Sequence, residues 1–156
     1  MEEDINLMLT PIKGNLLFQS IFKKSKKISN SKLAIYIVFR NNSNQGRQAE
    51  DRAKHPIAIK YAAMVKKKIV KKAVCRNKVK RLVRVSLREL LRDPANLDLS
   101  MHTQYVIVMW NSPLGKPNEL KLSEVKQEIA ELFARAKFSL KNYTSKPNEN
   151  NPDKYN

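Results

Sequence analysis

The feature that most constrains this chain is the stretch from Ile69 to Pro94, IVKKAVCRNKVKRLVRVSLRELLRDP. At about 100° of rotation per residue, this stretch divides into two opposite arcs. One arc can be buried and contains Cys75, Val79, Leu82, Val83, Ser86, Leu87 and Leu90. The other arc is basic and contains Arg76, Asn77, Lys80, Arg81, Arg84, Arg88 and Arg92, with Lys78 at its edge. Because only Val85 and Leu91 fall on the wrong side, the pattern predicts one long amphipathic helix.

The charge of this predicted helix is unbalanced. Glu89 is its only acid before the terminal Asp93-Pro94, so i,i+4 ion pairs cannot neutralise the basic arc. The whole chain of 156 residues has a formal net charge of +17. A surplus of this size favours a polyanionic partner, such as nucleic acid, an anionic membrane or an acidic protein.

Composition excludes several other classes of protein. The hydrophobic content of 42% suits a globular protein, and the length suits one domain with a core of its own. No apolar run approaches the roughly 18 residues that a membrane span needs, and the acidic start MEEDINLML is unlike a signal peptide. The single cysteine rules out an intrachain disulfide framework. We therefore expect a soluble, cytoplasmic protein with no membrane partner.

The pattern along the chain predicts helices at both ends of a single domain. Residues 1–12 are expected to be an irregular lead-in, residues 13–141 the domain, and residues 142–156 a disordered polar tail. Asn15 is predicted to cap a first helix, NLLFQSIFKKSKK. Ser123 is predicted to cap a last helix whose apolar residues recur at helical spacing.

Strands are predicted where β-branched and aromatic residues cluster, at 32–40, 56–65 and 103–110. Residues 66–72 are rich in lysine and fit a third short strand or an extended turn before the long helix. Residues 41–55 form a long polar loop, in which His55 has no second metal ligand at a binding spacing. The predicted order is αβββαβα, an α+β fold with helices packed on a sheet.

The sequence contains no recognisable catalytic constellation. It has no Ser/His/Asp set, no paired carboxylates in an apolar frame and no Cys/His cluster, and its three glycines make no phosphate loop. Cys75 lies on the buried arc, where a small hydrophobe is the expected role. If this chain serves an enzyme, another molecule is expected to supply the chemistry.

An RNA- or DNA-binding surface is what remains. Rows of Arg and Lys suit phosphates, and aromatic rings add about 1–3 kcal/mol per stacked base. Phe18, Phe22 and Tyr36 are the candidate rings, since they lie on the elements before the basic helix. Helix patterning alone leaves open whether the phenylalanines are core residues or line a groove.

The run KKAVCRNKVKRLVR resembles the signature of the bacterial ribonuclease P protein component, usually seen as A-V-x-R-N-R-x-K-R-x-x-R. The resemblance extends, in order, to FQSIF, LAIYIVF, YVIVMW and LSEVKQEIAELF, over about residues 10 to 140. It implies a small α+β sandwich with a central mixed or antiparallel sheet, three helices and a left-handed βαβ crossover, against the right-handed rule.

The resemblance also implies a function. In that family the protein is the accessory subunit of an endoribonuclease that removes the 5′ leader of precursor tRNA. The RNA subunit carries the chemistry and uses Mg²⁺, so no catalytic residue is expected in the protein. The implied partners are the ribonuclease P RNA and precursor tRNA, with one protein per RNA.

Site residues follow from the resemblance by position. Those that match the signature and would contact RNA are Arg76, Asn77, Lys80, Arg81 and Arg84, and Lys78 stands where the family commonly has arginine. Beyond that match, Arg88 on the basic arc and Lys67 and Lys68 in the lysine run before the helix are also expected to contact RNA. Those expected to line a cleft for the 5′ leader are Phe18, Phe22 and Tyr36. Where the family commonly has a Gly before Ala-Val, this chain has Val70-Lys71-Lys72, so the first residue of the helix is left open.

Two other readings share the basic surface. A non-enzymatic ribosomal or RNA-chaperone protein would bind RNA but would not use the three aromatic residues in any cleavage. A DNA-binding helix in a major groove would need a short turn and a supporting helix before the basic one, where this sequence has strands and lysines.

Overall fold

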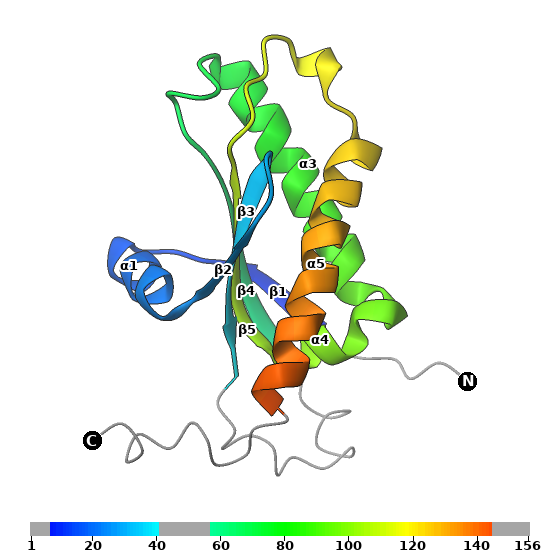
Figure 1. Cartoon of the computed structure of the whole chain (residues 1–156). Coiled ribbons are helices and arrows are strands. Elements are labelled where there is room, and N and C mark those ends of the chain that lie inside the picture. Colours follow the sequence, from blue (N-terminus) through cyan, green and yellow to red (C-terminus); the bar gives the residue numbers. More distant parts are fainter. Residues whose placement is uncertain (1–6, 41–56, 145–156) are drawn as a thin grey trace.

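The computed structural model describes residues 7–40 and 57–144 (Figure 1). The loop predicted at 41–55, including His55, lies outside the described residues, and so does the chain from residue 145. The description therefore covers the basic helix, the aromatic candidates and the predicted strands.

A five-stranded mixed sheet forms the centre of the fold, in the order β1-β4-β5-β3-β2. Its strands are β1 (Leu7–Pro11), β2 (Lys26–Ser29), β3 (Leu33–Phe39), β4 (Ile57–Val65) and β5 (Thr103–Trp110). The β1–β4 and β4–β5 pairs are parallel, whereas β3–β5 and β2–β3 are antiparallel. The predicted α+β class with a mixed sheet is confirmed.

Helices cover the two faces of the sheet unequally. The chain forms α1 (Asn15–Lys24), α3 (Ala73–Arg92), α4 (Leu97–His102) and α5 (Leu122–Thr144), with short 3-10 turns η2 (Pro94–Asn96) and η3 (Pro117–Glu119). Helices α3, α4 and α5 lie on one face, and the short α1 lies alone on the other (Figure 1). The main core fills the first face, and a smaller cluster around Ile21, Val38 and Ile107 lies under α1.

The connection from β4 through α3 to β5 joins two parallel neighbours, so it has a hand. In Figure 1 β4 runs up the sheet, α3 returns down its right-hand side, and β5 runs up again one place nearer the β2–β3 edge, which faces the viewer. This path is left-handed, as the resemblance implies and against the usual rule.

The basic helix has the predicted faces. The buried side chains of α3 are those of the predicted arc, together with Leu91. Leu91 is buried because η2 and α4 fold back against the end of α3: Asn96 Nδ2 donates to Leu90 O at 2.9 Å, and Ser100 Oγ donates to Leu91 O at 2.6 Å. A helical wheel contains no information about this return of the chain.

Two strands depart from the sequence prediction. An irregular lead-in up to residue 12 is wrong for residues 7–11, because β1 pairs in parallel with β4. The first helix ends at Lys24, since Ser25 is extended at φ −79° and ψ 155°, and Lys26–Ser29 then pair with β3.

The third strand expected at 66–72 is wrong, because those residues form the alternative, a turn. The observed order is therefore βαβββααβα: β1, β2 and α4 are added to the prediction, and the strand at 66–72 is absent.

Helix boundaries also differ from the prediction. Gly14, with φ 98°, is the N-cap residue of α1, so Asn15 is the first helical residue and not the cap. Helix α5 begins at Leu122, which places Ser123 inside the first turn, and it ends at Thr144, past the predicted end at 141. Helix α3 begins at Ala73 rather than Ile69, because Val70 is fully buried in the preceding turn.

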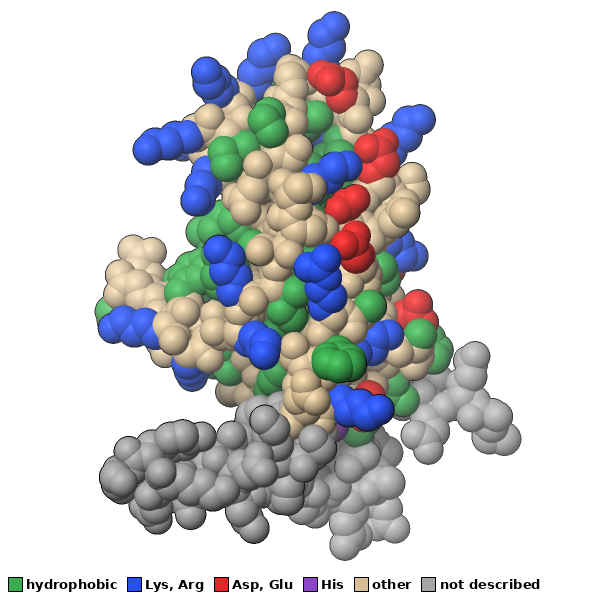
Figure 2. Space-filling view, viewed as in Figure 1, with side chains coloured by type: hydrophobic (Ala, Val, Ile, Leu, Met, Phe, Trp, Pro, Cys, Tyr) green, Lys and Arg blue, Asp and Glu red, His purple; other side chains and the backbone are tan. Residues whose placement is uncertain are grey.

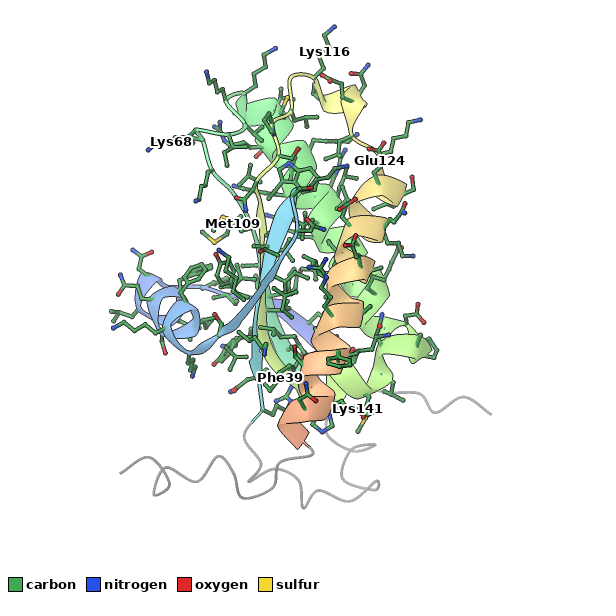
Figure 3. All side chains as sticks on the ribbon, in the orientation of Figure 1. Phe39, Lys68, Met109, Lys116, Glu124 and Lys141 are labelled. Atoms are coloured by element: carbon green, nitrogen blue, oxygen red, sulfur yellow. The ribbon has the colours of Figure 1, made fainter. Side chains whose placement is uncertain are left out.

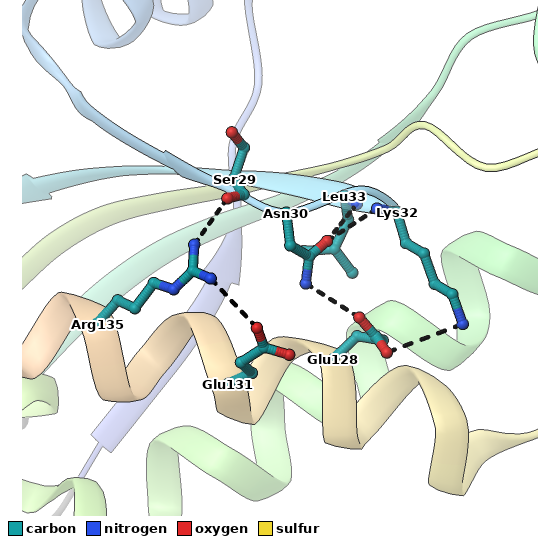
Figure 4. A network of polar contacts seen from close by, with 7 residues as sticks. All are labelled: Ser29, Asn30, Lys32, Leu33, Glu128, Glu131 and Arg135. Atoms are coloured by element: carbon teal, nitrogen blue, oxygen red, sulfur yellow. Dashed lines mark hydrogen bonds and ion pairs between the residues drawn. The ribbon is translucent and has the colours of Figure 1, made fainter.

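A polar network ties α5 to the β2–β3 hairpin (Figure 4). Asn30 Oδ1 accepts from the backbone N–H groups of Lys32 and Leu33, while its Nδ2 donates to Glu128 Oε1 at 3.0 Å. Arg135 donates to Ser29 O at 2.9 Å and to Glu131 at 3.3 Å. Glu128 therefore binds the hairpin directly, and Glu131 does so through Arg135.

We expect the Ser86→Ala change to stabilise the protein. Ser86 is 0% exposed, and its Oγ has no hydrogen-bond partner among the described residues. Removing an unsatisfied buried hydroxyl from a helix should raise the free energy of unfolding by about 0.5–1.5 kcal/mol. Ser100→Ala is the matched control: Ser100 is equally buried but bonded, so its loss should lower stability by about 1–2 kcal/mol. Urea denaturation followed by circular dichroism measures both; a loss of stability in Ser86→Ala contradicts the expectation.

Candidate nucleic-acid interface

The acids of the described residues are confined to one part of the fold, whereas Lys and Arg occur throughout it. Residues 7–40 and 57–88 contain no Asp or Glu, although they supply α1, four of the strands and most of α3. In Figure 2 Lys and Arg gather over the top of the molecule and its left side, whereas the visible acids follow η3 and α5. One side of the protein therefore has no carboxylate of its own to neutralise its cations.

The basic face of α3 forms one wall of a groove of roughly 500 Å³. The side chains that line it are Val74, Asn77, Lys78, Lys80, Arg81 and Arg84 from α3 and Pro117 from η3. Five residues predicted from the signature, from Asn77 to Arg84, thus converge on one surface. Val74, 59% exposed, adds apolar surface beside Pro117. Cations next to aliphatic atoms suit a ribose-phosphate strand better than an isolated ion.

Arg76 is placed differently from the other signature residues. Its Nη1 donates to Val70 O at 3.0 Å and to Lys71 O at 2.7 Å. Among the predicted contact residues within the described chain, it alone shows hydrogen bonds to the protein. Arg76 therefore lies at the junction between α3 and the turn before it.

Residues 66–72 form this turn, here called the lysine turn. The exposed Lys67 and Lys68 lie within it, and the backbone N–H groups of Ile69 and Val70 both donate to Lys66 O, at 3.1 and 3.0 Å. In Figure 3 Lys68 projects toward the side of the sheet that carries α1. Because the turn follows β4 and precedes α3, it bridges the two faces of the sheet.

Arg88 lies apart from the main groove. It lines a second groove between α3 and α5, together with Val85, Glu89, Arg92, Asp93 and Lys126. Here Lys126 Nζ is 2.9 Å from Glu89 Oε1, so the acid of α3 is paired with α5. The structure therefore does not bring Arg88 together with the signature residues.

The three aromatic candidates meet on the α1 face of the sheet. The ring centroids of Phe18 and Phe22 are 6.5 Å apart, and Phe22 meets Tyr36 edge-on at 4.9 Å. All three are partly buried against the small cluster under α1. Their rings therefore pack against this cluster and also keep part of their surface exposed. Both roles that the sequence left open, core packing and the lining of a groove, are compatible with this placement.

Several neighbours of these rings were not predicted. Tyr105 and Met64 pack in the same cluster, and Lys24 and Lys27 stand over rings: Lys24 Nζ is 5.6 Å from the Tyr105 centroid, and Lys27 Nζ is 5.7 Å from that of Tyr36. The alternation in TQYVIVMW places Tyr105 and Ile107 on one strand face, which was an available signal. This face lies next to Tyr36 because β5 pairs with β3, where Val38 is opposite Tyr105. The sequence pattern alone does not give that pairing.

The described residues bring together cations and aromatic rings, the side-chain types that suit phosphates and unpaired bases. They contain no group of three or more His, Cys, Asp or Glu side chains that could hold a metal ion. None of the helices described is long and apolar enough to cross a membrane. The arrangement is a basic groove, a lysine turn and a half-open aromatic cluster with lysines at its edge.

Comparison with known proteins gives consistent matches. Residues 10–137 match the sequence model of the Ribonuclease P family. The chain is 27% identical over 126 residues to the ribonuclease P protein component of Shouchella clausii (strain KSM-K16), covering 81% of this chain and 84% of that protein.

Two solved structures share the fold. The Thermotoga maritima RNase P protein aligns with a TM-score of 0.55 and 21% identity, over 80% of this chain and 96% of that one. The Staphylococcus aureus RNase P protein aligns with a TM-score of 0.53 and 22% identity, over 81% and 94% of the two chains.

Proposed function

Because this chain belongs to the ribonuclease P protein family, we propose that its basic groove binds the ribonuclease P RNA and that its aromatic cluster holds the 5′ leader of precursor tRNA. The chain is the protein component of an endoribonuclease complex that matures the 5′ end of tRNA. The observation that carries the assignment of surfaces is the acid-free region at 7–40 and 57–88, which contains all the α3 residues of the groove and the three predicted rings.

The groove is suited to the RNA subunit. Lys78, Lys80, Arg81 and Arg84 point into one depression and have no ion-pair partner among the described residues. Cations left unpaired in the free protein are available to phosphates, and binding then gains entropy from the counterions that RNA releases. Asn77 adds an amide that can read the edge of a base.

The aromatic cluster is suited to the leader, which is single-stranded. Stacking does not depend on sequence, and the lysines beside the rings can follow the phosphates. Lys24 and Lys27, placed over Tyr105 and Tyr36, would have to swing aside or bridge to a phosphate when a base stacks there. Both movements are available to flexible exposed side chains.

Catalysis belongs, in this proposal, to the RNA. The donor set of the described residues does not fit a metal held by the protein alone, so we assign Mg²⁺ to the RNA subunit and no step to a protein side chain. The protein's contribution is to bind and orient two RNAs. The proposal includes one protein per RNA and a cytoplasmic location, where tRNA precursors are transcribed in bacteria.

The decisive experiment is reconstitution. Bacterial ribonuclease P RNA is incubated with precursor tRNA at low Mg²⁺, with and without the protein. We expect the protein to stimulate cleavage at the mature 5′ end, with a plateau at one equivalent. Absence of stimulation at any protein concentration would refute the proposal.

Salt dependence tests the groove in a second way. Four groove cations that contact phosphates should contribute about −3 to −4 to the slope of log affinity against log salt. The measurement is a binding titration with ribonuclease P RNA between about 0.05 and 0.3 M salt, the range in which this effect is usually resolved. A slope near zero rules out the basic face as the contact surface.

A further inference from the structure

We propose that Arg76 is a positioning residue: it closes the lysine turn against the start of α3, so that Lys67 and Lys68 reach the RNA together with the groove. This role rests on the proposed binding of ribonuclease P RNA. It differs from the phosphate contact that the signature implies for Arg76, and it makes a different prediction for a change that keeps the charge.

The first argument is the geometry of the side chain. A single nitrogen, Nη1, donates to the carbonyl oxygens of both Val70 and Lys71, at 3.0 and 2.7 Å. This nitrogen has two N–H groups, and both are used by the two carbonyls. Neither carbonyl accepts a backbone hydrogen bond among the described residues, so Arg76 satisfies two acceptors that the turn leaves open.

The second argument is that the turn has little else to close it. It contains no glycine, and no described residue other than glycine has a positive φ. Its remaining ties are the two N–H bonds to Lys66 O, the burial of Val70, which is 0% exposed, and the packing of the half-buried Ile69 against the core. Five of its seven residues are lysines, whose mutual repulsion favours an open turn.

The third argument is electrostatic. Helix α3 has no acid in its first turn and no side-chain cap, and its N-cap residue is Lys72. A cation near this positive end of the helix dipole is unfavourable unless it meets negative partial charge. The two carbonyl oxygens supply that charge to Arg76. A guanidinium at this position is therefore more stable when it is directed at the carbonyl oxygens of the turn than when it is directed at solvent.

The consequence is a link between the turn and the groove. A closed turn holds Lys67 and Lys68 at a fixed place beside the groove. These lysines can then bind phosphates of the RNA without the backbone of the turn first having to become ordered. When the turn opens, these lysines keep their charge but lose their position. RNA binding must then order the turn, and the conformational entropy lost in doing so weakens the affinity.

The free protein tests the link without RNA. Lysyl endopeptidase cleaves after lysine, and cleavage needs an open backbone. We expect Arg76→Lys to raise the rate of cleavage within residues 66–72 by about tenfold, which corresponds to about 1.4 kcal/mol of opening free energy. Arg81→Lys adds the same kind of new site to the same helix and should leave cleavage in the turn unchanged. An unchanged rate in Arg76→Lys, or a rise spread over all lysines, overturns the proposal.

RNA binding provides the second test, with charge as the variable. We expect Arg76→Lys and Arg76→Gln to weaken binding to ribonuclease P RNA equally, by about five- to tenfold, and to reduce the salt slope by about 1.5 for the two lysines lost. At Arg81, Lys should preserve the slope while Gln reduces it by about 0.7–0.9. Wild-type affinity and slope in Arg76→Lys, with a loss only in Arg76→Gln, would show a phosphate contact instead.

A double-mutant cycle completes the design. In a Lys67→Gln/Lys68→Gln background, Arg76→Lys should have no further effect on RNA affinity, because the residues through which it acts are gone. Additive losses overturn the proposal. If wild-type protein fails to bind the RNA, the proposed function fails, while the cleavage test of the turn in the free protein still decides the role of Arg76.

Discussion

Replacing Lys80, Arg81 and Arg84 together by glutamine should weaken binding to ribonuclease P RNA by roughly 10²–10³-fold at physiological salt. The three side chains line one groove on α3 with no ion-pair partner among the described residues. At about 1–1.5 kcal/mol for each charge-assisted phosphate contact, their loss costs about 3–4.5 kcal/mol. The salt slope should become shallower by about 2–2.7, since each lost contact contributes about 0.7–0.9.

A matched triple change separates this local effect from net charge. Lys121 directly precedes α5, and Arg135 and Lys137 lie on it, near the acids of that helix. Their replacement by glutamine removes the same three charges and should weaken binding by less than about fivefold, because charges beyond a Debye length of about 8 Å are screened. Equal losses in the two triples would mean that RNA senses only total charge, and the groove would lose its assignment.

Replacing Phe18, Phe22 and Tyr36 together by leucine should abolish most of the preference for precursor over mature tRNA. The two substrates differ by the leader, and each lost base stack is worth about 1–3 kcal/mol. A decrease in preference of roughly tenfold or more is therefore expected in competition cleavage assays. Leucine is chosen over alanine because all three rings pack in the cluster with Ile21 and Val38, where alanine would leave a cavity.

Two controls make this prediction specific. Binding of ribonuclease P RNA without substrate should be unchanged in the triple leucine variant, because the groove lies on the opposite side of the sheet from α1. Leu16→Ala changes a residue of the same helix that is 83% exposed, and it should leave both readouts as in the wild type. Preserved discrimination in the triple variant would favour a ribosomal or RNA-chaperone protein, which needs no leader cleft.

The parts of the fold that repeat along the chain could be predicted from the sequence. The two faces of α3 follow from a 3.6-residue period, and β3, β4 and β5 follow from compact apolar runs. Strands β1 and β2 were missed because each is short and is defined by its partner: Leu7 pairs with Ile57, and Lys26 pairs with Ile37. The pairing of β1 depends on residues far away in the sequence, whereas β2 forms a local hairpin with β3 in a segment whose first residues had been assigned to the first helix.

The candidate site shows the same division. The groove residues from Asn77 to Arg84 could be predicted together because they share one face of one helix. The three aromatic residues lie on two elements, α1 and β3. That Tyr105 and Met64 pack beside them follows from the strand order β4-β5-β3, which the sequence pattern does not give. Arg76 was grouped with the RNA contacts because its position on the wheel is basic. Its bonds to Val70 and Lys71 depend on the path of the turn, which no periodicity encodes.

The separation of charge described above also affects how the protein meets its partner. With acids confined to residues beyond 88 in the described chain, the molecule has a strong electric dipole that points from α5 toward the side of α1 and the lysine turn. A polyanion at a distance exerts a torque on such a dipole, so most encounters would begin in the productive orientation. The acids of η3 and α5 would then serve association kinetics by offsetting the cations of their own side, so that the attraction of a polyanion is concentrated on the acid-free side.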